Sequence, residues 1–285
     1  MNTKNIIELS DGKKLCYAEY GDPKGEPVFL FHGNPGARLS WGLYPGSPFL
    51  QNIRIIAPDR PGYGRTDFKK KALEKWPGDV GELANYLGIS KFHLFAPSGG
   101  GPYTLACALK IPERLKSIGL FGSVGPYSTE SVQGVNKPLI VLWKIANPLF
   151  GLVKLQNRII ANIAKNKPQK LYKSFRDLEL SDYDKSIAEK PEIQRIFNEV
   201  FPESYLQHGI GSAYDVTLPK KWNIPLDQIK SKIILWHAEE DCLVGNMTKY
   251  LAEKLPNSEL INIPNAGHLW IMEHIKEVLE KLINN

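Results

Sequence analysis

Short apolar runs alternate with longer stretches of helical periodicity along most of the chain. Many of these runs contain β-branched residues and show no polar alternation, which predicts strands covered on both faces, as in a parallel sheet. They occupy residues 28–33, 53–59, 92–96, 115–122, 232–238 and 259–264. Between them, helical patterns predict helices at 76–88, 101–110, 246–255 and 272–283. This alternation predicts an α/β fold with a mostly parallel, doubly wound sheet.

Two features modify this rhythm. The runs at 6–9 and 14–21 flank an Asp-Gly-Lys turn sequence, which predicts an antiparallel hairpin at the N-terminal end. From Gly125 to Pro225 no run is typical of a strand, and apolar residues recur at helical spacing. A long helix-rich segment between two strands of one sheet predicts an inserted helical cap at 125–225. The α/β core then comprises residues 1–124 and 226–285.

Composition narrows the class of protein. The chain has 285 residues, 42% of them hydrophobic and 23% charged, which is sufficient to bury a core. The net charge of +6 is mild for this length. No basic stripe is interleaved with aromatic residues. The positive charge therefore indicates a solvated, lysine-rich surface rather than a nucleic-acid partner.

Cysteine usage and hydropathy bear on location. Three cysteines lie far apart with no metal-ligand spacing, which indicates a reducing compartment: Cys16, Cys107 and Cys242. The N-terminal residues lack an apolar signal core. Lysines and two prolines interrupt the most apolar stretch, 137–155, so it falls short of the ~20 apolar residues of a membrane span. We therefore expect a cytoplasmic protein without a membrane span.

Chemistry-bearing residues follow several predicted strands. Parallel sheets bind ligands beyond the carboxyl ends of their strands, so these positions are the candidates for a site. They carry a glycine-rich turn (HGNPG, 32–36), a serine in PSGGGP (97–102), acids in HAEED (237–241) and a histidine in NAGH (265–268). A further loop, PDRPGYGRTD (58–67), contains Asp59, Arg60 and Arg65, which we interpret as fixing that loop.

These motifs, in this order, resemble the α/β-hydrolase superfamily over residues 1–124 and 226–285, and the cap lies where that family inserts one. The resemblance implies a triad of Ser98 as nucleophile, His268 as base and Asp241 as the carboxylate that orients the base. The family's serine turn reads Gly-x-Ser-x-Gly. Here Ala96 replaces the first glycine, the smallest possible steric departure. The alternative is that Ser98 is only a serine in a structural glycine loop.

The resemblance also implies an oxyanion hole made of two backbone N–H groups. One belongs to Gly99, directly after the nucleophile. The other is assigned to Asn34, because Pro35 has no N–H. His32 in the same motif is interpreted as structural.

A serine at the nucleophile position predicts a serine hydrolase that cleaves a small carboxylic ester through an acyl-enzyme, without cofactor or metal. One alternative is an aminopeptidase of the proline iminopeptidase type, which needs acidic cap residues to hold the substrate's amino terminus. The candidates are Asp177, Glu179, Asp182 and Asp184. Another is a non-catalytic binder of small molecules on the same scaffold. Apolar cap residues are candidates for lining an acyl pocket: Leu139, Ile140, Trp143 and Phe150. The sequence leaves substrate identity and oligomeric state open.

Overall fold

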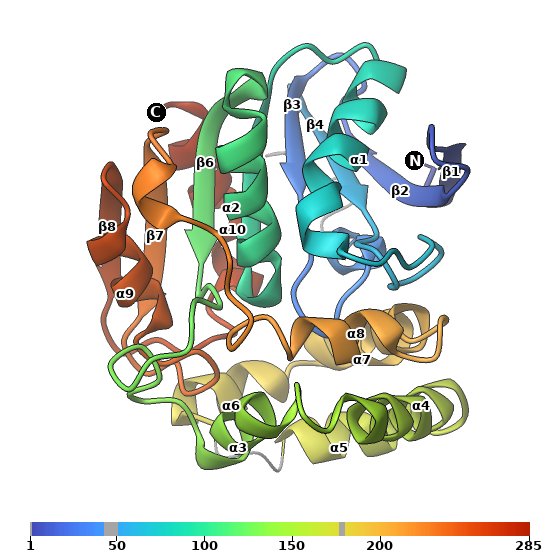
Figure 1. Ribbon diagram of the computed structural model, residues 1–285, viewed down its shortest axis with the longest axis vertical. Helices are drawn as coiled ribbons and strands as arrows, with labels where there is room; N and C mark the ends of the chain where they lie inside the picture. Colours follow the sequence, from blue (N-terminus) through green and yellow to red (C-terminus); the bar gives the residue numbers. More distant parts are fainter. Residues whose placement is uncertain (1, 43–50, 177–179) are drawn as a thin grey trace.

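A computed structural model describes residues 2–42, 51–176 and 180–285 (Figure 1). Eight strands form a sheet in the order β1-β2-β4-β3-β5-β6-β7-β8. From β4 through β3 to β8 neighbouring strands are parallel, while β2 pairs antiparallel with both β1 and β4. The mostly parallel sheet and the N-terminal hairpin are therefore confirmed. The strands are β1 (Asn5–Glu8), β2 (Lys14–Gly21), β3 (Glu26–Leu30), β4 (Ile53–Pro58), β5 (Phe92–Pro97), β6 (Leu115–Phe121), β7 (Ile233–Ala238) and β8 (Ser258–Ile263).

Helices cover both faces of the sheet. On one face lie α1 (Ala72–Tyr86), α2 (Gly101–Lys110) and α9 (Met247–Lys254), and on the other lies α10 (Ile271–Ile283) (Figure 1). Each layer buries its own apolar cluster against the strands. This two-sided burial explains the continuous apolar runs, since all six residues of β7 are buried. Short 3₁₀ turns occur at Arg38–Trp41, Ser98–Gly100, Pro112–Arg114 and Leu226–Gln228.

Two element boundaries differ from the sequence prediction by three residues or more. Helix α1 begins at Ala72 rather than at residue 76, after Lys71 in the left-handed region (φ 56°), and Pro77 lies inside it. Its first turn is held by Ala72 and Leu73, which are buried although lysines surround them in the sequence. Strand β3 ends at Leu30 rather than at residue 33, because the chain leaves the sheet there to form the HGNPG loop.

The segment between β6 and β7 is helical, and none of its described residues forms a strand. It contains α3 (Lys137–Ile145), α4 (Phe150–Asn166), α5 (Pro168–Arg176), α6 (Asp182–Ala188), α7 (Pro191–Ser204) and α8 (Ile210–Asp215). These six helices, which we call the cap, lie beyond the carboxyl ends of the parallel strands (Figure 1). The division into a core of 1–124 and 226–285 and a cap of 125–225 stays our prediction. No helix in the described ranges is long and apolar enough to cross a membrane.

Candidate active site

Ser98 lies at the tip of a sharp turn between β5 and α2. Its φ of 54° is in the left-handed region, a conformation that costs a non-glycine residue roughly 1–3 kcal/mol. Glycine is required two residues later, because a Cβ on Gly100 would lie 2.8 Å from the Cβ of Ala96 and 2.9 Å from the carbonyl oxygen of His32. The buried methyl group of Ala96 therefore packs directly against Gly100. The small residues on either side of Ser98 in the sequence Ala-Pro-Ser-Gly-Gly thus allow the chain to form this sharp turn.

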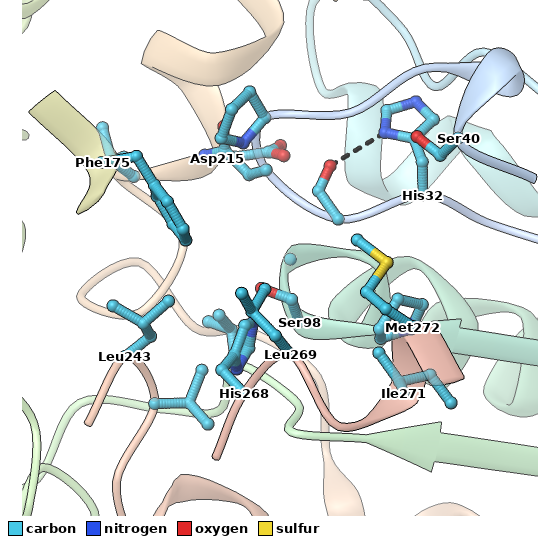
Figure 2. Close-up of a pocket in the computed structure, with 18 of the residues that line it drawn as sticks. His32, Ser40, Ser98, Phe175, Asp215, Leu243, His268, Leu269, Ile271 and Met272 are labelled. Atoms are coloured by element: carbon cyan, nitrogen blue, oxygen red, sulfur yellow. Dashed lines mark hydrogen bonds between the residues drawn. The ribbon is translucent and has the colours of Figure 1, made fainter. Parts of the chain in front are cut away.

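The turn faces a cavity of about 310 Å³ between the sheet edge and the cap. Figure 2 shows Ser98 and His268 facing this cavity together with the apolar side chains of Leu243, Leu269 and Met272. Cap helices supply further aromatic and aliphatic walls, among them Phe175 of α5. Ser98 and His268 therefore line one largely apolar cavity.

His268 is held by a buried carboxylate. Its Nδ1 lies 2.7 Å from Oδ2 of Asp241, whose side chain is fully buried. The other oxygen of Asp241, Oδ1, accepts hydrogen bonds from the backbone N–H groups of Leu243 (2.9 Å) and Val244 (3.1 Å). Asp241 is therefore fixed in place, and it leaves Nε2 as the ring nitrogen that can exchange a proton.

Gly122 lies directly beneath this pair. It has a φ of +47°, and a Cβ there would come within 2.8 Å of Oδ2 of Asp241 and 3.1 Å of Nδ1 of His268. Only glycine combines this backbone conformation with so close an approach.

A second carboxylate, Asp184 of cap helix α6, supports the histidine through the backbone. Its Oδ2 accepts from the N–H of His268 (2.9 Å) and its Oδ1 from the N–H of Leu269 (2.7 Å). Burial alone would lower the pKa of His268, but the carboxylates of Asp241 and Asp184 raise it above its usual value. Burial raises the pKa of Asp184 itself, against the opposing effect of the two N–H donors.

The two segments expected to bind an oxyanion are in contact. A Cβ on Gly99 would lie 2.9 Å from the Cβ of Asn34 and 3.3 Å from its backbone nitrogen. Both residues line the cavity, next to Ser98. The N–H of Asn34 donates to no acceptor within the part of the chain that the structure describes.

The loop that carries Asn34 is held from below by Arg60. The Arg60 guanidinium donates to the carbonyl oxygens of His32 (2.9 Å) and Gly33 (2.9 Å), and the Arg60 N–H donates to Nε2 of His32 (3.0 Å). Since Nε2 accepts, Nδ1 of His32 carries the proton and donates to the Gly33 oxygen (2.8 Å, dashed in Figure 2). Burial lowers the pKa of His32 well below its usual value, so this ring is neutral and structural.

Asp215, at the end of α8, was not identified from the sequence. It lines the cavity, yet its Oδ2 pairs with Arg60 (2.6 Å) and accepts from the hydroxyl of Tyr63 (2.7 Å), while its Oδ1 accepts from Tyr103 (2.8 Å). Burial alone would lower the pKa of Arg60, but the Asp215 carboxylate raises it. This buried ion pair joins the cap to the loop after β4. A lone aspartate at a helix end offers no sequence signal for such a partner 155 residues away.

The structure thus brings together the residues that the sequence singled out. Ser98, His268, Asn34 and Gly99 line the cavity, and Asp241 lies behind His268.

The other predicted residues divide between loops, cavity and cap. Asp59 accepts from the backbone N–H groups of Arg38 (2.7 Å) and Arg65 (3.0 Å) and so fixes its loop, as expected. Leu139 and Trp143 line the cavity. Phe150 packs within the cap, and Ile140 packs into a cluster that joins the cap to Val244 and Met247 of the core.

The acidic candidates in the cap do not border the cavity where they are described. Asp182 is exposed, and Asp184 is committed to the backbone N–H groups. Asp177 and Glu179 lie outside the described residues. In the described ranges, no group of three or more His, Cys, Asp or Glu side chains is arranged to hold a metal ion.

The sequence and the fold of this chain are similar to those of known hydrolases. Lipase 3 of Moraxella sp. (strain TA144) is 24% identical over 279 residues, which cover 95% of this chain and 80% of the lipase. Proline iminopeptidase of Neisseria meningitidis serogroup B is 28% identical over 183 residues, 60% of this chain and 54% of the peptidase. The crystal structure of a hydrolase from Pseudomonas aeruginosa PA01 superposes with a TM-score of 0.73 at 17% identity, over 99% of this chain and 98% of that one. A family model of the alpha/beta hydrolase fold matches residues 26–275. The chain therefore belongs to the α/β-hydrolase superfamily.

Proposed function

We propose that the protein is a serine hydrolase that cleaves a small, uncharged carboxylic ester, with Ser98, His268 and Asp241 as its triad. One combination of observations supports the proposal. Ser98, with its strained backbone, and His268 line the same cavity, and Nδ1 of His268 lies 2.7 Å from Oδ2 of the buried Asp241. A serine hydroxyl is a weak nucleophile until a base removes its proton, and an oriented histidine provides that base.

The proposed reaction has two halves. Oγ of Ser98 attacks the ester carbonyl while Nε2 of His268 accepts the hydroxyl proton, and Asp241 stabilises the resulting imidazolium. His268 then returns the proton to the departing alcohol, which leaves an acyl group on Ser98. Water, deprotonated by His268, releases the acid and restores the serine. The N–H groups of Gly99 and Asn34 bind the oxyanion, and one such donor contributes roughly 3 kcal/mol.

The charge state of the cavity favours an uncharged substrate. Of the described residues that line the cavity, one is acidic. This residue, Asp215, forms an ion pair with Arg60, which balances its charge. It has no free charge with which to hold the ammonium group of a peptide substrate. The apolar walls instead match an alkyl or aryl group, and the lipase relative supports ester chemistry. The peptidase relative covers less of the chain, so the aminopeptidase stays the second candidate.

Hydrolysis of p-nitrophenyl butyrate by the wild-type protein and by Ser98→Ala tests the proposal. We expect the substitution to lower kcat/KM by at least about a thousandfold without changing the thermal unfolding midpoint. Retained activity would reject Ser98 as the nucleophile. Faster turnover of proline p-nitroanilide than of the ester would favour the aminopeptidase, and saturable binding without turnover of either would favour a binding protein.

A further inference from the structure

The positive charge of the chain is concentrated in one part of the cap. Residues 131–176, which include α3, α4 and α5, contain nine basic residues and no acidic residue. Since the whole chain carries +6, the remainder carries a net charge of −3. The basic residues are Lys137, Lys144, Lys154, Arg158, Lys165, Lys167, Lys170, Lys173 and Arg176. The eight before Arg176 are exposed, and none forms an ion pair with another described residue.

The same segment leaves large aliphatic side chains in solvent. Six of the ten exposed large hydrophobic residues of the described chain lie between residues 141 and 159, each at least 39% exposed. They are Val141, Ile145, Leu149, Leu152, Leu155 and Ile159. Single exposed aliphatic residues are common, but such a concentration in one segment indicates an interaction surface, because each of these side chains forfeits the free energy of burial.

Helical spacing separates these groups into distinct faces. On α4, Val153, Asn157 and Ala161 face inward, while Leu152, Leu155 and Ile159 share an outer face. Lys154 and Arg158, one turn apart, lie along the flank between them.

Helix α3 is divided in the same way. Its Leu139 and Trp143 line the cavity, whereas Val141 and Ile145 face solvent. We give the name outer cap face to the outward aliphatic residues of α3 and α4 and the basic residues beside them. These are Val141, Ile145, Leu152, Leu155 and Ile159, with Lys154 and Arg158. Helices α3 and α4 are among the helices that lie farthest from the sheet (Figure 1).

We propose that the outer cap face docks on an anionic lipid surface, with the helices lying in the plane of the interface. Aliphatic residues on one side and lysine and arginine beside them are the two contributions that bind an amphipathic helix to a bilayer: apolar burial and attraction to anionic headgroups. A second copy of the chain is disfavoured, because a two-fold contact would set this acid-free face against itself. A nucleic acid would attract the charge but would leave the aliphatic side chains unpaired.

Co-sedimentation with vesicles tests the proposal on the full chain. We expect binding to equimolar phosphatidylcholine and phosphatidylglycerol to exceed binding to phosphatidylcholine alone, and to weaken with added salt. The double substitution Lys154→Gln/Arg158→Gln should reduce the partition coefficient by roughly twenty-five-fold, about fivefold per charge. Leu155→Asn/Ile159→Asn should reduce it by at least about tenfold while leaving the charge intact.

Matched controls make the result specific. Lys91→Gln/Lys110→Gln removes the same charge before β5 and at the end of α2, at the opposite end of the parallel strands, and should leave binding unchanged. Leu260→Asn removes an exposed aliphatic residue from β8 with the same expectation. Thermal unfolding of each variant establishes that it is folded. Equal binding to both vesicle types, or equal losses in the controls, would overturn the proposal. So would self-association abolished by Leu155→Asn/Ile159→Asn, or binding to a DNA oligonucleotide in place of vesicles.

Discussion

The substitution Asp184→Asn tests how far the cap takes part in positioning the proposed base. Asp184 reaches from α6 to the loop that carries His268 and accepts one backbone N–H on each carboxylate oxygen, at 2.9 and 2.7 Å. Its carboxylate is also one of the charges that raise the pKa of His268. Asparagine keeps the shape of the side chain. It lacks the charge, however, and presents an amide N–H₂ to one of the two backbone donors.

The expected magnitudes follow from this geometry. A hydrogen bond to a charged group contributes roughly 1.5–3 kcal/mol, so the loss of one should lower the free energy of unfolding by about 2 kcal/mol. Displacement of the histidine should lower the plateau of kcat/KM by about tenfold. The pKa of His268 should fall, because a charge that stabilises the imidazolium is gone. Since the base works in its neutral form, the acid limb of the pH profile should move to lower pH.

The assay is kcat/KM for p-nitrophenyl butyrate across the pH range in which a histidine titrates. The wild-type acid limb should have an apparent pKa above 6.5, the ordinary value from which that of His268 is raised. The matched control is Asp182→Asn, on the same helix, where the carboxylate is exposed and pairs only with Lys185 among the described residues. It should leave the profile unchanged. An Asp184→Asn profile that superposes on the wild-type profile, limb and plateau alike, would refute a positioning role for Asp184.

Two further substitutions probe the geometry around the triad. Ala96→Val adds two methyl groups at a fully buried position that packs against Gly100, so we expect the free energy of unfolding to fall by roughly 1–3 kcal/mol and kcat/KM to drop with it. Full activity would argue against the tight turn. Gly122→Ala places a methyl group 2.8 Å from Oδ2 of Asp241 at a φ of +47° and should cost about a hundredfold in kcat/KM. Its control is Gly78→Ala in α1, where nothing lies within 4 Å of the added methyl, and similar losses in the two would contradict the assignment.

Much of the fold could be predicted because burial on two faces leaves a local mark on the sequence. The run IILWHA in β7 is apolar except for His237, and the structure buries all six residues. Helix α2 matches its predicted range of 101–110 for a similar reason, since eight of its ten residues are buried. The early start of α1 was missed because three lysines precede it and because Pro77 resembles a helix start rather than an interior residue.

The candidate triad residues could be chosen because each follows a strand in an order that this superfamily uses. The contacts that hold these residues in place could not be predicted, because they join segments far apart in the chain. Arg60 meets Asp215 across 155 positions, and Asp184 meets His268 across 84. Asp184 is one of four acidic cap residues that the sequence offers for substrate binding. Nothing in its local sequence distinguishes a buried acceptor of backbone N–H groups from an exposed carboxylate such as Asp182.

Covalent labelling tests the central proposal, an activated Ser98, most directly. The wild-type protein is incubated with a fluorophosphonate, and the adduct is located by mass spectrometry of its peptides. We expect a single adduct on Ser98, no labelling of Ser98→Ala, and labelling of His268→Ala slowed by about a thousandfold or more. An unlabelled wild-type protein, an adduct on another serine, or equally fast labelling without His268 would contradict it.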